Sequence, residues 1–354
     1  MPAVSKAQQR FMGMVHAVKK GEMKAPSPEV AQAAASMKKK DAKDFASTKH
    51  DKLPEKKEAK DLINSLLDIF ALFVNLDLRR FSTLIVSDAF DDEIRKITTR
   101  STLVMKNKFL LNNNTHAMVL TLIKDDTYEM VLVLKSCFAL NLIRNEKNPI
   151  RYKDAIHIVH HEFAHIHDIN KKIDAKKDFF SNKSVGINEI FYPIAELCWS
   201  EYIANFISSA SATKSAYPLI MAQKLIKLIK NNNLEILLKE SKKDLTDDVL
   251  KKISEEINTL LKTSSYLLGY LHGFKISLDE LDPKLAFELE NSPFIDTWDI
   301  LSYEFYAIRK NYPKCFLNDN TYDSLCLAIE SAYNKTGILF FEKENKKCEA
   351  KVLY

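Results

Sequence analysis

The most constraining feature of this chain is a His-Glu-x-x-His motif, His161 to His165, set in an apolar pattern of helical period. Ala155, Val159 and Phe163 recur every fourth residue, which predicts an amphipathic helix through the motif. Residues four apart on a helix lie one turn above each other on the same face, so the two imidazoles can meet at one metal ion. The fold must therefore hold this helix beside a segment that completes the shell of the ion.

The residue types in the motif indicate hydrolysis at zinc. Zn²⁺ suits imidazole ligands, and a catalytic zinc site keeps one position open for water. The ion lowers the pKa of that water towards 7, so a neighbouring carboxylate can take its proton as the oxygen attacks a carbonyl. Glu162 points about 100° round the helix from His161, within reach of the water without binding the ion. The motif is typical of zinc metallopeptidases, with Glu162 as general base and then acid. A histidine-rich helix without metal is the alternative.

A third protein ligand is expected from the next helical stretch, residues 194–206. It offers Glu196 and Glu201. We favour Glu201, because Asn205 lies one turn further on the same face and its amide oxygen can hold His161 by the other ring nitrogen. Glu196 as the ligand, or a solvated Glu201, are the alternatives.

His157 is the main rival ligand, because it lies one turn before His161 on the same face. We interpret it as a residue of the pocket wall that supports the ligands without binding the metal. Other ligand sets stay open, because five of the nine histidines fall within eleven residues: His157, His160, His161, His165 and His167.

Two segments resemble the motifs of the ImmA/IrrE type of metallopeptidase: His161-Glu162-Phe163-Ala164-His165 and Glu201-Tyr202-Ile203-Ala204-Asn205-Phe206. The resemblance covers roughly residues 80–210. It implies a cytoplasmic gluzincin that acts on a protein or peptide substrate. Many members of that family belong to mobile elements or stress circuits, and known members cleave a repressor.

Residues 1–58 differ in composition from the rest, with no Ile, no Asn and a single Leu. Residues 1–60 hold 14 Lys and Arg against 7 Asp and Glu, although the whole chain has a net charge of only +5. Two helices are predicted, from about Ser5 to Lys20 and from Ser27 to about Lys40. A core of their own is not expected at this size. The segment resembles a family of short uncharacterised proteins of phages and bacteria, and a nucleic-acid-binding arm, a protein-docking segment and a solvated tail are all open interpretations.

The remaining pattern predicts an α+β fold: a mostly helical, zincin-like metallopeptidase with a small β-sheet before the active-site helix and a basic helical N-terminal appendage. One strand of the sheet is expected to hold an extended peptide by its edge. We predict three regions: 1–58, a catalytic region 59–210, and a mostly helical region 211–354. The expected elements are a helix at 59–75, strands near 82–87, 102–111, 118–123 and 128–134, a surface loop at 170–188, helices near 215–232, 234–240, 246–275 and 321–336, and terminal strands near 338–341 and 352–353.

Simpler sequence patterns indicate the cellular compartment and argue against some classes of protein. No secretory pattern is visible, the apolar run 62–76 is too short to cross a bilayer, and the five cysteines are scattered, so a cytoplasmic protein without membrane contact is expected. Glycine motifs for dinucleotides or phosphates are absent. The sequence does not rank the groups that could polarise a scissile carbonyl: Tyr192, Tyr202, His272 and Tyr303. The alternative function is a non-catalytic regulatory or binding protein of a mobile element, with a structural zinc site and the basic arm.

Overall fold

The structure is a computed structural model, and helices predominate in it. It describes residues 6–36, 38–46, 75–100, 102–103, 116–124, 127–143, 149–176, 186–213, 216–231, 246–342 and 348–352, with single positions at 64, 69, 73 and 239. The chain divides into two units, of which the first comprises residues 1–74, 86–90 and 134–155, and the second the remainder.

The N-terminal segment of the first unit forms three helices, α1 (Lys6–Lys20), α2 (Pro28–Ser36) and α3 (Lys39–Ala46). The first predicted helix is confirmed, but the second ends four residues early and a third helix was missed. The segment was not expected to hold a stable core, and its three helices enclose a small apolar cluster, consisting of Met12, Val15, Val30, Ala34 and Ala42. The same unit contains the short helices α6 (Ser136–Ala139) and η2 (Leu140–Leu142).

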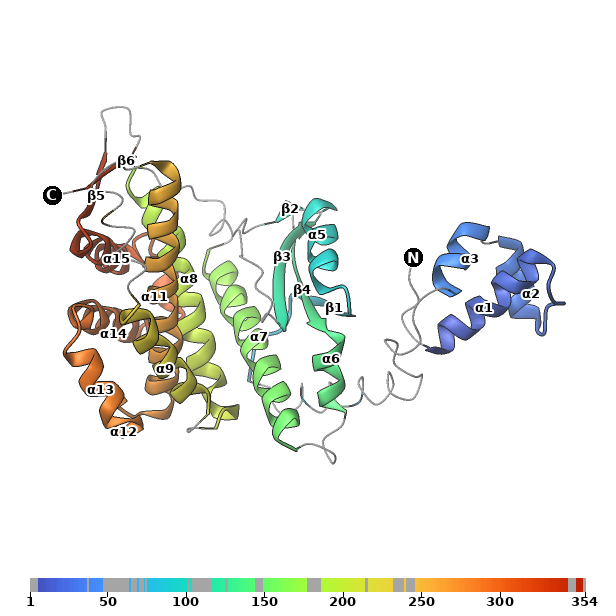
Figure 1. Ribbon diagram of the computed structural model, residues 1–354, viewed down its shortest axis with the longest axis horizontal. Helices are drawn as coiled ribbons and strands as arrows, with labels where there is room; N and C mark the ends of the chain where they lie inside the picture. Colours follow the sequence, from blue (N-terminus) through green and yellow to red (C-terminus); the bar gives the residue numbers. More distant parts are fainter. Residues whose placement is uncertain are drawn as a thin grey trace. The chain divides into compact units, whose positions relative to one another are not determined.

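The predicted small sheet has four strands in the order β1-β4-β3-β2 (Figure 1). The short β2 pairs antiparallel with the end of β3, where Thr102 faces Ile123 and Leu103 faces Leu122. The rest of the predicted strand at 102–111, and nearly all of the predicted helix at 59–75, lie outside the described residues. The strands are β1 (Phe81–Ser87), β2 (Thr102–Leu103), β3 (Ala117–Lys124) and β4 (Thr127–Lys135).

Helix α5 (Phe90–Arg100), which follows β1, was not predicted. Its first turn carries Asp91, Asp92 and Glu93, which favour a helix N-terminus because they complement its partial positive charge. Its apolar residues are too few to reveal the helix by periodicity, since only Phe90 and Ile94 are buried.

The motif lies on α7 (Pro149–Ala175), which is longer than predicted. Residues 170–175 were expected in a surface loop, and this was wrong, because Asn170 and Lys172 are fully buried within the helix. Polar and charged residues predict an exposed segment only where no group of another element pairs with them. Asn170 meets a partner before β1, and Lys172 meets one on the next helix.

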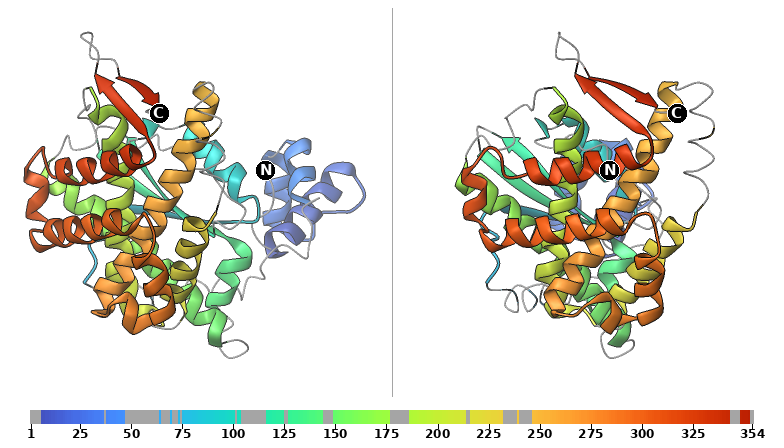
Figure 2. Two further views of the ribbon diagram at one scale, coloured as in Figure 1. Left: turned by 60° about the vertical axis from the view of Figure 1, so that its left-hand side comes forward. Right: turned by 90° about the vertical axis from the view of Figure 1, so that its left-hand side faces the viewer.

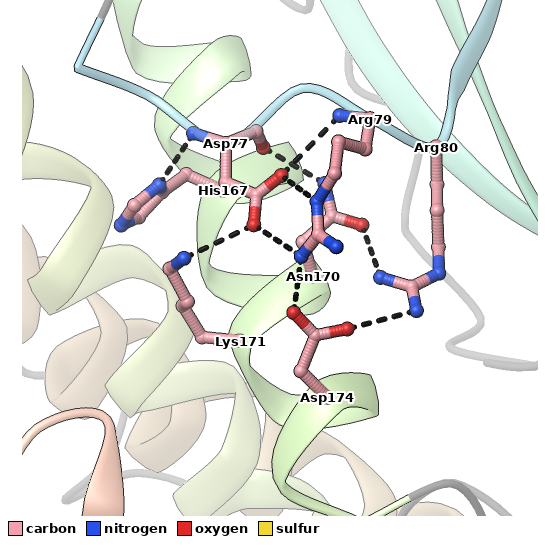
Figure 3. Close-up of polar contacts among 7 residues, drawn as sticks. All are labelled: Asp77, Arg79, Arg80, His167, Asn170, Lys171 and Asp174. Carbon is pink, nitrogen blue, oxygen red and sulfur yellow. Dashed lines mark hydrogen bonds and ion pairs between the residues drawn. The ribbon is translucent and has the colours of Figure 1, made fainter.

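A polar network joins α7 to the segment that leads into β1 (Figure 3). The backbone N–H of Asp77 donates to His167 Nδ1 at 2.7 Å, and the Asn170 amide donates to the Asp77 carbonyl at 2.8 Å. Arg80 reaches Asn170 and Asp174, at 2.9 Å each. Phe81, at the start of β1, then packs on Phe163 of α7, with ring centroids 5.8 Å apart. These contacts fix the strand to the helix that carries the motif.

Helix α8 (Asn188–Ser208) packs most extensively on α11 (Asp247–Phe274), and Figure 2 shows the two side by side. It begins before Tyr192 and Pro193, which were expected to precede it. Thr246 caps α11 by accepting a hydrogen bond from the Val249 N–H. Gly269 is required where the helices cross, because a Cβ there would lie 2.5 Å from the Tyr202 carbonyl oxygen.

The other elements of the second unit surround α8 and α11. The helices near 215–232, 246–275 and 321–336 and the strand near 338–341 are confirmed, while 234–240 lies almost entirely outside the described residues. The last strand was expected at 352–353, but it begins earlier, at Cys348, and Leu353 lies outside the described residues. No helix in the described part of the chain has both the length and the apolar character needed to cross a bilayer. These elements are η3 (Ser209–Ser211), α9 (Tyr217–Ile229), α12 (Leu278–Leu281), α13 (Pro283–Glu290), α14 (Ile295–Lys310), η4 (Lys314–Leu317), α15 (Asp323–Lys335), β5 (Ile338–Glu342) and β6 (Cys348–Val352).

Candidate metal centre

Three of the predicted residues meet between α7 and α8. His161 and His165 present their Nε2 atoms 3.0 Å apart, and Glu201 Oε2 lies 3.4 Å from each of them. The imidazole planes are nearly perpendicular, at 89°, and the Nε2 atom of each ring faces the same carboxylate oxygen. Within the described residues, this is the group of His, Cys, Asp or Glu side chains found close enough together to hold a metal ion.

The chemistry of these three atoms fits a cation. Neutral imidazole nitrogens and a carboxylate oxygen all carry lone pairs, so they repel one another at such distances unless a proton or a metal ion lies among them. Glu201 Oε2 is buried and accepts no hydrogen bond from the described residues. In a tetrahedral zinc site with ordinary bond lengths, the atoms that bind the metal lie about 3.4 Å from one another. The observed separations of 3.0–3.4 Å match that spacing.

One histidine of the group is held by its other ring nitrogen, but the partner differs from the one expected. His165 Nδ1 lies 3.0 Å from Ser200 Oγ, and donation to that oxygen leaves Nε2 as the acceptor. Asn205 was expected to hold His161, but no hydrogen bond joins these two among the described residues. Asn205 is buried, and its Nδ2 is without a hydrogen-bond partner there.

Glu162 faces the sheet from the same turn of α7. It is 8% exposed, and burial raises its pKa to about 7, with Glu201 adding to the rise and His161 opposing it. The backbone N–H of Val119 in β3 donates to its carboxylate. A carboxylate with a pKa near neutrality can both accept and return a proton at physiological pH.

Helix α11 contributes two residues that sequence reasoning missed, Lys262 and Tyr266. Lys262 Nζ lies 2.9 Å from Glu201 Oε1, and the Tyr266 ring stacks over His161 with centroids 6.1 Å apart. Burial by itself would raise the pKa of Glu201, but the Lys262 ammonium holds it well below its ordinary value. Burial and the Glu201 carboxylate raise the pKa of Tyr266. The available signal was weak: a lysine and a tyrosine one turn apart within an apolar helix, far along the chain.

The rival ligands have other partners. Glu196 accepts from Lys172 Nζ at 2.6 Å, and it does not belong to the metal-binding group. His157 Nε2 lies 2.6 Å from the Tyr270 hydroxyl, and its Nδ1 lies 3.1 Å from Ser211 Oγ. Burial lowers the pKa of His157 to about 3. His157 is therefore a neutral, hydrogen-bonded residue one turn before the centre.

The four residues considered for polarising a carbonyl make their contacts elsewhere. Tyr202 bonds to His272 and Arg309, at 2.8 and 3.0 Å. Tyr192 packs on Tyr322, and Tyr303 is 69% exposed. The Tyr266 ring, by contrast, lies over His161.

The arrangement therefore offers two imidazoles and one carboxylate oxygen to a metal, with a buried carboxylate, an ammonium and a phenol close by. When the chain is compared with models of protein families, with curated proteins and with solved structures, none of the three comparisons finds a match.

Proposed function

We propose that this protein is a zinc-dependent peptidase of the gluzincin type, in which His161, His165 and Glu201 hold the metal. The observation that supports it most is the meeting of these three acceptor atoms, 3.0–3.4 Å apart, from two helices. Structural zinc sites use four protein ligands, whereas catalytic sites use three and leave a position for water. The group of three among the described residues favours the catalytic kind.

The protein groups around the centre have distinct roles in this proposal. When bound, zinc supplies a Lewis acid that polarises water and a peptide carbonyl. Glu162 would take a proton from water and return it to the leaving amine, and its burial beside the proposed ligands suits that role. The Tyr266 hydroxyl bonds to the Glu201 carboxylate and would have to turn from it to donate to the oxygen that becomes negative.

In this proposal the edge of β3 would hold the substrate as an extended peptide. Strand β2 pairs only with Leu122 and Ile123, so from Ala117 to Thr121 the outer edge of β3 has no strand partner among the described residues. Val119 N–H points from this stretch to Glu162. A peptide added along the edge would be held by backbone hydrogen bonds and would pass next to the proposed base.

The test combines metal content with loss of one carboxylate oxygen. Protein purified without chelator should contain close to one zinc per chain by emission spectrometry, in the wild type and in Glu162→Gln alike. Cleavage of a peptide library, followed by mass spectrometry, should fall by about 10²–10⁴-fold in Glu162→Gln. Glu255→Gln, on an exposed part of α11, is the matched control and should cleave normally. Zinc far below one per chain, or unchanged cleavage by Glu162→Gln, would contradict the proposal.

A second function, nucleic-acid binding by residues 1–58, is favoured by the charge on the three N-terminal helices. The exposed charged side chains described there are six lysines and one glutamate: Lys20, Lys24, Lys38, Lys39, Lys40, Lys43 and Glu22. Phosphate contacts made by lysine weaken steeply with salt. Affinity for duplex DNA that falls with salt, and that is lost when residues 1–58 are deleted, would support this function. No binding at low salt would exclude it.

A further inference from the structure

We propose that Lys262 is a positioning residue that presents Glu201 to the metal through a single carboxylate oxygen. The inference rests on the proposed metal centre and concerns how its third ligand is held. It does not depend on which bond the protein cleaves.

The two oxygens of Glu201 have different surroundings. Oε1 lies 2.9 Å from Lys262 Nζ, which makes it half of an ion pair. Oε2 lies 3.4 Å from the Nε2 atoms of both histidines and accepts no hydrogen bond from the described residues. One oxygen is thus engaged by the protein, while the other faces the two imidazoles.

The ammonium is held in this place by its helix. Its side chain is 33% exposed, and Nζ lies 5.5 Å from the ring centroid of Tyr266, one turn further along α11. At Gly269, α11 approaches α8 so closely that a Cβ would lie 2.5 Å from the Tyr202 carbonyl oxygen. The height of Lys262 relative to Glu201 is therefore set by a close contact of two backbones.

This geometry limits how Glu201 can bind a metal. Binding through both oxygens would require Oε1 to leave the ammonium, and the carboxylate is 8% exposed, so little water could replace the lost partner. Binding through Oε2 alone keeps the ion pair and leaves more of the coordination shell for water and substrate. The positive charge of Lys262 also offsets the carboxylate, so the ion keeps more of its own charge for polarising what it binds.

The pair differs from an ordinary surface ion pair. On the same helix, Lys252 Nζ lies 2.7 Å from Asp248 Oδ2, a similar distance, but both side chains are more than half exposed. Exposed pairs contribute little, because water and salt screen them. Lys252 is therefore a matched control for an ammonium–carboxylate contact that cannot affect the centre.

The experiment uses the full chain, freed of metal and loaded with Co²⁺, which absorbs visible light more strongly in four-coordinate than in five-coordinate sites. The variants are Lys262→Met, Lys262→Gln, Lys262→Arg and the control Lys252→Met. Zinc affinity is measured in parallel by competition with a chelator. Two neutral variants are included so that one remains if the other does not fold.

We expect Lys262→Met and Lys262→Gln to show the weaker absorption of a five-coordinate site, because Glu201 then binds through both oxygens. Zinc affinity should rise by about 10-fold, because the carboxylate gains a bond to the ion and a nearby cation is removed. Lys262→Arg and Lys252→Met should retain the wild-type spectrum. A wild-type spectrum in a folded neutral variant overturns the proposal, and so does a gain in affinity without a spectral change, which would make Lys262 only a nearby charge.

Failure of the wild type to bind Co²⁺ or Zn²⁺ would instead refute the metal centre itself, whereas normal binding without proteolysis would refute only the peptidase.

Discussion

The interface between α7 and α8 contains two clusters of ionisable side chains, and they are built differently. Both belong to one stripe of α7, since its residues recur at the spacing of a single helix face. The first cluster consists of His161, His165 and Glu201, and the second of Asp168, Lys172 and Glu196.

The second cluster supplies its own cation. Lys172 is 0% exposed, and its Nζ lies 2.6 Å from Asp168 and 2.6 Å from Glu196. Burial by itself would lower the pKa of Lys172, but the two carboxylates hold it above its ordinary value. In the first cluster, three acceptors meet while the nearest ammonium is engaged with the far oxygen of Glu201. A cluster neutralised from within the chain suits a structural role, and one whose acceptors converge suits an added ion.

The largest expected effect on stability comes from removing the cation of the second cluster. Lys172→Met leaves two carboxylates buried without their cation, which should lower the free energy of unfolding by about 3–5 kcal/mol. Urea denaturation followed by circular dichroism measures it. Lys171→Met is the control: this neighbour is 29% exposed and pairs with Asp77, so its loss should cost about 1 kcal/mol or less. Equal losses in both variants would show that burial of Lys172 does not matter.

The next prediction separates the two carboxylates of α8. Glu201→Gln replaces an anionic ligand by a weak neutral one and should lower zinc affinity about 100-fold. Glu196→Gln should leave zinc affinity within about 3-fold of wild type, because Lys172 is its partner and no ligand is lost. Competition with a chelator measures both. If Glu196→Gln lost zinc while Glu201→Gln kept it, the ligand assignment would have to be exchanged.

The first cluster could be predicted from the sequence only in part. His161 and His165 could be paired from spacing alone, because four residues on a helix fix their geometry. Glu201 was favoured over Glu196 by its neighbour Asn205, and the structure does bring Glu201 to the histidines. However, the hydrogen bond used in that argument is not present, and Ser200 holds a histidine instead. That choice of ligand was therefore argued from a contact that the structure does not contain.

The parts that were missed depend on contacts between distant segments. Lys172 is preceded by another lysine, and three of the next five residues are charged, which is the pattern of a surface. Nothing local shows that Asp168 and Glu196 will enclose it. Lys262 lies 61 residues after Glu201, and only the packing of α11 on α8 brings it near. Helical period and caps predict where helices lie, whereas the pairing of charges between helices follows from the tertiary packing.

A third prediction concerns the crossing that places Lys262. In Gly269→Ala, the new Cβ would lie 2.5 Å from the Tyr202 carbonyl oxygen and 2.8 Å from Asn205 Cβ, so α11 must move away from α8. We expect a loss of about 2 kcal/mol in unfolding free energy, together with weaker zinc binding. Gly13→Ala, in α1, is the control, because nothing lies within 4 Å of its added Cβ and alanine favours helix. Unchanged stability in Gly269→Ala would mean that the crossing tolerates a methyl group.

The smallest expected effect comes from a third polar cluster, next to Glu201 in sequence, which is closed by hydrogen bonds. Arg309 Nε donates to the Tyr202 oxygen at 3.0 Å, so the Tyr202 hydroxyl donates to His272 Nδ1 at 2.8 Å. His272 must then be neutral, with Nε2 donating to Ser302 Oγ at 3.2 Å. Burial, and then Arg309, lower the pKa of His272 from 6.5 to about 4.

The sign of the pH effect follows from that shift. Between pH 6.5 and about 4 the unfolded chain binds a proton at His272 that the folded chain does not, so acidification favours unfolding. Because the ring is partly exposed, we expect its share between pH 7 and 5 to be only about 1 kcal/mol. The glutamine of His272→Gln can accept the hydrogen bond from Tyr202, but it does not titrate. The unfolding free energy of this variant should therefore drop by about 1 kcal/mol less between pH 7 and pH 5 than that of the wild type. The other buried histidines titrate equally in both proteins and cancel in the difference. Parallel pH dependence of the two proteins in urea denaturation would show that His272 is already solvated in the folded state, and that this cluster, unlike the Lys172 cluster, is not closed to water.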